Sequence, residues 1–331
     1  MSPRARHVTL DTIREAARDV YGVAMRTPLV RLEIPDDWRE RYPRAPRDLL
    51  VKLETLQPVG SFKIRGAFTA IARLSAAERA GGVWTVSAGN AAQGVALAAR
   101  ELGAPCTVLV IDTAPRTKLD AVRRLGATLV PVTHEEAWRT VESRESPHAR
   151  GVFVHPFDDD AFISGNGTIG LELVEDVPDL DTVFVPVGGG GLAAGIARAV
   201  LALRPDASVV GVEPVTAAPF AASRAAGRPV RFDGWQASFV DGAGGRSVLP
   251  SMWPLLETVT AAQVVELDDV RQAMRLVAER LHVIAEGAAA SAVAAALTAT
   301  ERSGRMVAVL SGGNIDLPRF AALVGAVPGA I

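Results

Sequence analysis

The sequence predicts an α/β protein whose mainly parallel sheets are covered by helices on both faces. Short apolar runs that read as strands alternate with segments of helical periodicity, and strands without a polar face are typical of buried parallel sheets. The 331 residues are too many for one small core and fit one large or two closely packed domains.

These periodicities assign most of the chain in order. A helix is expected at 10–21 and a short strand at 27–32, followed by a surface loop at 33–48 that is rich in Pro, Arg and Asp. A strand at 49–53 then leads into a helix at 62–74. Further strands are expected at 83–86, 106–111, 128–132, 152–154, 181–187, 207–212 and 305–310, and further helices at 91–102, 115–125, 134–144, 160–176, 190–203, 268–282 and 286–300.

Two regions concern the domain organisation. Residues 219–262 show no clear period. The three strand–helix units between about 81 and 158 form a compact block. We therefore predict a small domain at 81–158, inserted into a large cofactor-binding domain made of 1–80 and 159–331.

Composition and charge narrow the class of protein. A net charge of −2 offers no basic surface for nucleic acid or an anionic membrane, no apolar run is long enough to span a bilayer, and the N-terminus does not read as a signal peptide. The single cysteine, Cys106, excludes an internal disulfide and is expected to be a buried apolar residue of a cytoplasmic protein. The five histidines lack metal-ligand spacing, so no metal site is predicted.

One lysine stands where amine chemistry is expected. Pro58 and Gly60 break the chain after the strand at 49–53, and Ser61 is predicted to be the N-cap of the next helix. Lys63 then lies in the first helical turn, where the positive end of the helix dipole should lower the pKa of its ammonium group. A lowered pKa is what an amine nucleophile needs. The alternative is an ordinary solvated lysine.

Two glycine-containing turns follow predicted strands and indicate anion binding. The turn at 87–94 opens a helix with small residues, and Ser87 and Asn90 add hydrogen-bond donors, so a carboxylate would fit there. The turn at 187–191 contains four consecutive glycines without Walker or dinucleotide-binding spacing, which favours a monophosphate bound by backbone N–H groups. The alternatives are an ordinary βα turn for the first and a purely steric need for glycine in the second.

Two more polar residues end predicted strands. Ser311 follows the strand at 305–310 and is expected to point into the crevice where parallel sheets bind ligands. Glu213 follows the strand at 207–212 and either caps a helix or has a functional role. A reactive lysine, a phosphate site and a carboxylate-sized turn together favour pyridoxal phosphate as cofactor and an amino acid as substrate.

The same motifs resemble those of a known family. The segments 52–67 (KLETLQPVGSFKIRGA), 87–90 (SAGN), 186–191 (PVGGGG) and 311–314 (SGGN) are similar to those of the fold type II pyridoxal-phosphate-dependent enzymes, the tryptophan synthase β-like group. The segments 155–159 and 165–168 add a resemblance to its serine/threonine dehydratase and serine racemase branch. This resemblance implies two three-layer αβα domains and pyridoxal 5'-phosphate as cofactor.

The resemblance also implies a role for each site residue. Lys63 would bond covalently to the cofactor and act with Ser87 as a catalytic residue. Ser311 would meet the ring nitrogen, and a hydroxyl there, in place of a carboxylate, is expected to favour elimination over transamination. The residues implied at the cofactor are Phe62, Lys63, Asn90, Gly188, Gly189, Gly190, Gly191, Glu286 and Ser311. Those implied at the substrate carboxylate are Ser87, Ala88, Asn90 and Ala91.

The chain departs from this branch at two positions. Ala91 stands where dehydratases usually carry histidine, which leaves room for a bulkier or differently polar substrate than serine or threonine. The divalent-cation site of related enzymes would here use Glu213 and the carbonyl of Ala217, but Pro219 replaces the expected acid, so no tight cation site is expected.

The resemblance therefore implies a pyridoxal-phosphate-dependent ammonia-lyase or dehydratase. Such an enzyme eliminates the 3-substituent of a 3-hydroxy or otherwise 3-substituted α-amino acid and yields a 2-oxo acid and ammonia. An amino-acid racemase and a β-replacement synthase of the same fold are the alternatives. A non-catalytic protein that binds the cofactor or an amino acid is the alternative of another class. We expect a cytoplasmic homodimer with a small amino-acid substrate.

Overall fold

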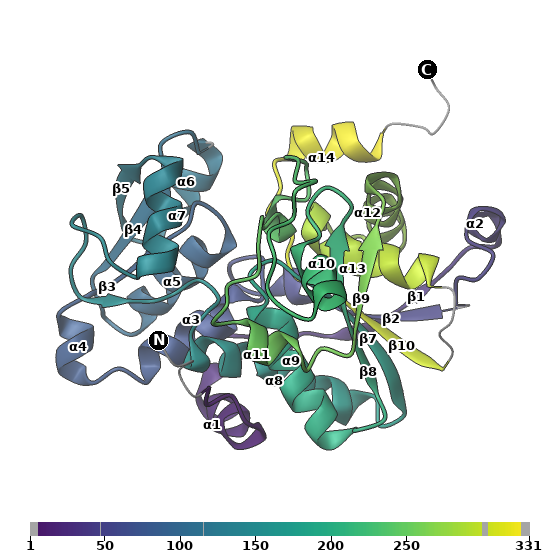
Figure 1. Ribbon diagram of the computed structural model, residues 1–331, viewed down its shortest axis with the longest axis horizontal. Coiled ribbons are helices and arrows are strands. Elements are labelled where there is room, and N and C mark those ends of the chain that lie inside the picture. The colour runs from purple at the N-terminus through teal and green to yellow at the C-terminus, as the bar shows by residue number, and fades with distance from the viewer. Residues whose placement is uncertain (1–5, 47, 115, 300–303, 326–331) are drawn as a thin grey trace.

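The computed structural model describes residues 6–46, 48–114, 116–299 and 304–325. Within these ranges the strands form two separate sheets, which lie on opposite sides of the molecule (Figure 1). The six-stranded sheet has the order β1 (Leu29–Glu33), β2 (Asp48–Lys52), β10 (Arg305–Val309), β7 (Leu180–Pro186), β8 (Ser208–Pro214) and β9 (Ala261–Val265). The four-stranded sheet has the order β5 (Thr128–Val132), β4 (Cys106–Ile111), β3 (Val83–Val86) and β6 (Val152–Phe153).

The strands pair in parallel except at one edge, where β1 runs antiparallel to β2. The α-helices are α1 (Leu10–Val20), α2 (Asp36–Arg41), α3 (Lys63–Ala72), α4 (Ala76–Ala80), α5 (Asn90–Glu101), α6 (Arg116–Arg124), α7 (His134–Ser143), α8 (Asp160–Asp176), α9 (Gly191–Leu203), α10 (Pro219–Ala226), α11 (Trp253–Leu256), α12 (Leu267–Leu281), α13 (Gly287–Thr298) and α14 (Leu317–Val324). Two 3-10 turns, η1 (Glu54–Leu56) and η2 (Asp241–Ala243), complete the described elements. None of these helices is long and apolar enough to cross a membrane.

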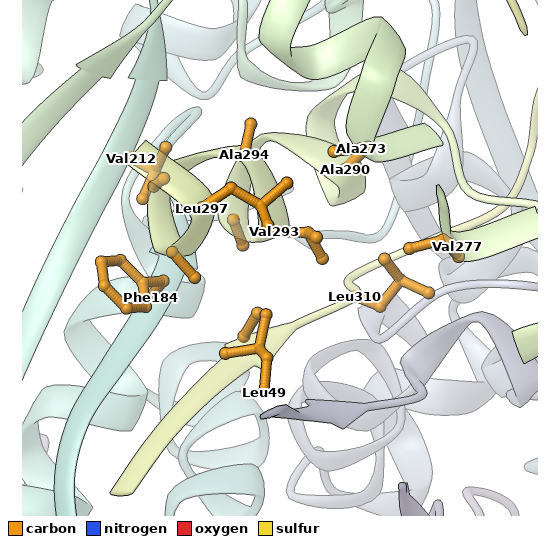
Figure 2. Packing of buried hydrophobic residues seen from close by; sticks show 14 of the residues in the cluster. Leu49, Phe184, Val212, Ala273, Val277, Ala290, Val293, Ala294, Leu297 and Leu310 are labelled. Atoms are coloured by element: carbon orange, nitrogen blue, oxygen red, sulfur yellow. The ribbon is translucent and has the colours of Figure 1, made fainter. Parts of the chain in front are cut away.

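Helices cover both faces of the six-stranded sheet. Along β7, Phe184 points into a core shared with α12 and α13, whereas its neighbours Val183 and Val185 point into a core shared with α8 and α9. Successive side chains of a strand alternate between faces, so an apolar strand fills two cores at once. Figure 2 shows the first of these cores, with Val293 and Leu297 of α13 packed over the sheet.

The four-stranded sheet has the same three-layer arrangement. One face packs against α3 and α5 through a core that includes Val83 and Val108, and the other packs against α7 through Leu109 and Val141. The sheet uses residues 83–153. We propose that it forms the core of the small domain, with the boundaries predicted at 81 and 158.

The predicted α/β class and mainly parallel sheets are confirmed, and the predicted strands and helices lie within two residues of the observed ends. The predicted ends at residues 115 and 300 lie outside the described residues. The expected surface loop at 33–48 was wrong in part, because it contains α2 and the first residue of β2. Asp36 and Asp37 in the first turn of α2 and two arginines in its last turn suit the helix dipole, a signal that the Pro and Arg content hid. The stretch 219–262 contains α10, η2, α11 and the start of β9.

Candidate active site

A cavity of about 550 Å³ lies where the turns after β3, β7 and β10 meet. In parallel sheets the carboxyl ends of the strands share one edge, which is where such turns come together. Every site residue predicted from the sequence lines this cavity: Phe62, Lys63, Ser87, Ala88, Asn90, Ala91, Gly188, Gly189, Gly190, Gly191, Glu286 and Ser311. The fold thus assembles residues that are up to about 250 positions apart in the chain.

Lys63 is the first residue of α3, as its position after the chain break predicted. The start of the helix is held against the β10 turn, because the backbone N–H of Phe62 donates to the Ser311 carbonyl at 3.0 Å. The Lys63 Nζ donates to the carbonyl of Pro156 at 2.6 Å and lies 5.1 Å and 5.4 Å from the ring centroids of Phe62 and Phe162. Apart from Pro156, its immediate surroundings are therefore largely aromatic.

This environment gives Lys63 a reactive amine. Burial lowers its pKa from 10.5 to about 8, and the nearby carboxyl of Glu286 partly opposes the effect. The direction of the shift agrees with the prediction from the sequence. The cause differs, because burial, and not the helix dipole, is the main contribution.

The predicted N-cap role of Ser61 is wrong. The residue before α3 is Phe62, which makes no side-chain capping bond. Ser61 instead forms an isolated antiparallel bridge with Gly312, and its hydroxyl is buried without a hydrogen-bond partner among the described residues. The bridge to the β10 turn takes Ser61 out of the capping position, a constraint that no local pattern reveals.

The turn at 87–91 presents the N-terminus of α5 to the cavity. Gly89 is the N-cap and its N–H donates to the Ser87 hydroxyl at 3.1 Å. The N–H groups in the first turn of a helix have no intrahelical acceptor and suit an anion. Ala91 lines the cavity with a methyl group, and the extra space expected there for a substrate stays a prediction.

Asn90 connects this turn to two other parts of the site. Its amide nitrogen donates to Glu286 at 2.7 Å, and its amide oxygen accepts from Asn314 at 2.8 Å. Burial, assisted by Asp241, raises the pKa of Glu286 to about 7, while the Asn90 hydrogen bond and the ammonium groups of Lys118 and Lys63 act in the opposite direction. Two residues implied at the cofactor by the resemblance thus contact each other directly.

The four glycines have both a steric reason and an open anion site. A Cβ on Gly189 would lie 2.2 Å from Cγ of Phe157, and one on Gly191 would lie 2.6 Å from the Phe157 carbonyl oxygen. Gly190, the N-cap of α9, has φ of +90°, a conformation that side chains disfavour. The N-terminus of α9 therefore opens onto the cavity without Cβ atoms. A phosphate fits this set of backbone donors.

The sequence missed several residues of the site. Lys118 of α6 donates to Asp241 of η2 at 3.0 Å, an ion pair between elements 123 positions apart that both line the cavity. Trp138 of α7 also lines it. Lys118 lies in no motif, so local signals were weak. Asp241 belongs to an Asp-Gly pair that resembles the family's Ala-Asp-Gly segment, but its pairing with Lys118 was not predicted. The Pro156 carbonyl is a backbone atom and carries no side-chain signal at all.

Other polar residues have structural partners. The carboxylate of Glu213 accepts the N–H groups of Phe220 and Ala221 at 2.9 Å each, so its helix-capping alternative is confirmed. Burial raises the pKa of Cys106 to about 12, as suits a buried apolar residue. Among the described residues, no group of three His, Cys, Asp or Glu side chains is placed to hold a metal ion.

Fold and site together define an α/β enzyme class in which one cavity is lined by a buried lysine and by a Cβ-free helix N-terminus. Residues 20–312 match the family described as "Pyridoxal-phosphate dependent enzyme", and the chain belongs to this family. This confirms the family, fold and cofactor predicted from the sequence. The residues present fit the cofactor, since the cavity combines a buried amine, a Cβ-free helix N-terminus and the Ser311 hydroxyl.

Within this family, the chain is similar to enzymes that act on threonine and serine. The chain is 39% identical to the L-threonine ammonia-lyase of Thermotoga maritima over 94% of this chain and 76% of that protein. It is 35% identical to the catabolic L-threonine dehydratase TdcB of Escherichia coli K12 over 97% of both chains. Among solved structures, maize serine racemase superposes with a TM-score of 0.84 at 31% identity, covering 95% of this chain and 96% of that chain.

Proposed function

We propose that this protein is a pyridoxal-phosphate-dependent ammonia-lyase that removes the elements of water, then ammonia, from a 3-hydroxy α-amino acid such as L-threonine or L-serine. The observation that carries the proposal is the buried Lys63 amine, which lines one cavity with an α5 turn suited to a carboxylate. The threonine ammonia-lyases and dehydratases among its relatives support this reaction class.

The chain supplies a separate site for each part of the reactants. The N-terminus of α9 at Gly188–Gly191 would hold the cofactor phosphate, and Lys63 would hold its aldehyde carbon covalently. The N-terminus of α5 at Ser87–Ala91 would hold the substrate carboxylate, which orients the amino acid with its Cα near Lys63. When bound, the cofactor supplies an electron sink for the negative charge that develops at Cα.

Lys63 would then act as the base. Once the substrate amine has replaced it, its amine is free, and a pKa of about 8 leaves a useful neutral fraction near neutral pH. The neutral amine would take the Cα proton, and the resulting Lys63 ammonium would return a proton to the departing 3-hydroxyl, which leaves as water. Ser311 lines the same cavity and would meet the ring nitrogen with a hydroxyl, which cannot stabilise a positive charge there as a carboxylate would. A hydroxyl in place of a carboxylate at this position therefore favours elimination of the 3-substituent over transamination.

Racemisation is the second candidate. Ser87 lines the same cavity as Lys63, and its hydroxyl would supply a second proton donor at Cα. The likeness to maize serine racemase supports this possibility. Both reactions begin with the same proton transfer to Lys63, so the two candidates share the base and differ only in the fate of the deprotonated substrate.

The test is incubation of purified holoenzyme with L-threonine and with L-serine, followed by assays for 2-oxo acid, ammonia and D-amino acid. We expect 2-oxo acid and ammonia in equal amounts, and the variant Lys63→Ala should lose about 10⁴-fold in kcat/KM because it lacks the base. Lys63→Arg serves as the control that keeps a cation. D-amino acid as the main product would favour the racemase, and turnover that survives Lys63→Ala would refute both candidates.

We also propose a cytoplasmic homodimer. The buried, unpaired Cys106 is compatible with a reducing compartment. Met25 and Leu56 are exposed apolar residues on neighbouring segments, since Met25 exchanges two hydrogen bonds with Gln57. Covering these two side chains is what association with a second copy would do. Light scattering of the purified protein would measure the mass directly, and a monomer at micromolar concentration would contradict the proposal.

A further inference from the structure

The acceptor of the Lys63 amine is a backbone carbonyl that belongs to an unusually well-anchored segment. The Pro156 oxygen lies 2.6 Å from the Lys63 Nζ, and Pro156 stands between His155 and Phe157 in the loop that joins β6 to α8. A loop carbonyl is a poor fixed point unless other groups hold the peptide units around it. Here such groups are present on both sides.

His155 holds the segment from within. Its Nδ1 accepts the backbone N–H groups of Phe157 at 3.3 Å and Asp158 at 2.9 Å, so this nitrogen carries no proton. The proton is therefore on Nε2, which donates to the carbonyl of Val141 in α7 at 3.1 Å. Burial lowers the pKa of His155 to about 4, which keeps this neutral tautomer in place.

Asp158 holds the segment from outside. Its carboxylate is only 2% exposed and accepts hydrogen bonds from Arg6 at 2.6 Å, Arg144 at 2.6 Å and Ser251 at 2.7 Å. These partners come from three separate places: the arm before α1, the end of α7, and the loop before α11. Charge-assisted bonds of this length are the strong class of protein hydrogen bond.

Of these three partners, Arg6 is the most distant from Asp158 in the sequence, and it makes further hydrogen bonds. Besides Asp158, its guanidinium donates to Asp160 Oδ1 at 2.7 Å and to the Ser251 carbonyl at 2.7 Å. The next backbone N–H, that of His7, donates to Asp160 Oδ2 at 2.9 Å. The Arg6 side chain is only 11% exposed, so residues 6 and 7 pack against the body of the protein.

We infer that His155–Asp158 is a positioning segment for the released amine of Lys63, and that Arg6 is a positioning residue that holds this segment from the N-terminal arm. The inference rests on the proposed role of Lys63. In the resting holoenzyme the cofactor would hold that nitrogen covalently. Once the substrate amine takes that place, Lys63 would be a free amine, and it would need an acceptor that keeps it near Cα.

The Pro156 carbonyl is that acceptor. The aromatic rings of Phe62 and Phe162 beside the amine offer no hydrogen-bond acceptor oxygen or nitrogen. The titratable groups that influence it are Glu286 and His155, and neither makes a hydrogen bond to it among the described residues. Displacement of a catalytic group by about 1 Å can lower a rate by up to about 100-fold. Anchoring of residues 155–158 therefore acts on kcat, and the resting covalent bond does not depend on it.

The test compares Arg6→Ala with Arg6→Lys and with the matched control Arg26→Ala. Arg26 also binds two carboxylates, those of Glu175 and Asp176, but on the exposed surface away from the cavity. We expect Arg6→Ala to lower kcat about tenfold, with KM within about twofold. Arg6→Lys keeps one ion pair and should recover part of kcat. Arg26→Ala should keep wild-type kcat.

Hydrogen exchange supplies a readout that does not depend on turnover. In the Arg6→Ala holoenzyme the amides of Phe157 and Asp158 should exchange about tenfold faster, while the amides of α3 should exchange as in the wild type. If Arg6→Ala does not fold, Ser251→Ala removes a single bond to Asp158 and should lower kcat about threefold in the same direction.

The outcomes separate this inference from the proposed function. A wild-type enzyme that forms no 2-oxo acid contradicts the proposed function, and the exchange measurement still tests the anchoring. A kcat for Arg6→Ala equal to that of Arg26→Ala contradicts the positioning role. So does a loss of kcat with unchanged exchange at residues 157 and 158, or an Arg6→Lys variant that is no better than Arg6→Ala.

Discussion

Two cationic residues on the first turn of α3, Lys63 and Arg65, have opposite surroundings although they are only two positions apart. The guanidinium of Arg65 is fully buried and donates to the carboxylates of Glu54 and Glu172, to the hydroxyl of Thr168 and to the carbonyl of Met25. Lys63 points to the other side of the helix and donates to the Pro156 carbonyl. One residue is enclosed by partners and the other faces a cavity.

The charges around these residues differ in the same way. Arg65 and Lys52 carry two positive charges, and Glu54 and Glu172 carry two negative charges, all within a region that is closed to solvent. Although burial acts to lower it, the pKa of Arg65 is raised by Glu54 and Glu172. Among the described residues, Glu286 is the one carboxyl that raises the pKa of Lys63, and burial outweighs it, so that this pKa falls to about 8.

This contrast teaches that burial alone does not decide what a charged residue does. A buried cation with matched carboxylates stays charged and fixes the elements around it, here α3, α8 and η1. A buried cation without a matched partner shifts towards its neutral form and becomes a base. The closed cluster holds α3 in place, so that the open end of the same helix presents Lys63 to the cavity.

The largest expected effect comes from breaking the closed cluster. Arg65→Met leaves Glu54 and Glu172 facing each other without their main partner, and we expect the free energy of unfolding to fall by about 3–5 kcal/mol. Urea unfolding of the purified variant measures this. The control Arg26→Ala removes two exposed ion pairs and should change stability by only about 1 kcal/mol or less. Equal losses in the two variants would mean that the buried cluster has no special role.

A smaller effect is expected at the phosphate end of the open site. In Gly189→Ala the new methyl group overlaps the Phe157 ring, which should lower stability by about 1–3 kcal/mol. Pairing it with Phe157→Ala removes the Cγ and Cδ atoms that the new methyl group would overlap, and should restore part of the stability. If the glycine also serves the phosphate, the double variant should still bind pyridoxal phosphate about tenfold more weakly, as measured by titration of the cofactor-free protein. If the double variant recovers both wild-type stability and wild-type cofactor affinity, glycine is needed at position 189 only to avoid the Phe157 ring.

The smallest expected effect is on the pKa of Lys63 when the charge of the neighbouring Glu286 is removed. The carboxylate of Glu286 raises the pKa of Lys63, so Glu286→Gln should lower that pKa further below 8, by roughly half a unit to one unit. The half-maximal rate of reductive methylation of Lys63 in the cofactor-free protein would therefore move to lower pH. A shift to higher pH would show that Glu286 does not act on Lys63 through its charge.

The same two cations show how far the sequence could be interpreted. The chain break at Pro58 and Gly60 located the start of α3, and the glycine-rich turns after three strands located the other walls of the cavity. Those signals are local, because a strand end, a turn and a helix start are each set by a few neighbouring residues. They were sufficient for the fold class and the cofactor, whereas Phe62 and Glu286 were implied only by the family resemblance, and Lys118 and Trp138 were missed.

Local pattern alone did not predict the partners. The role of Ser61, the Phe157 ring beside Gly189, the Lys118–Asp241 pair and the Pro156 acceptor each depend on segments that are distant in the chain. The sequence by itself determined which groups this protein has for chemistry and at which strand ends they stand. Only the tertiary structure decided which of them are paired and which are left open, because burial and pairing depend on which distant residues the folded chain brings into contact.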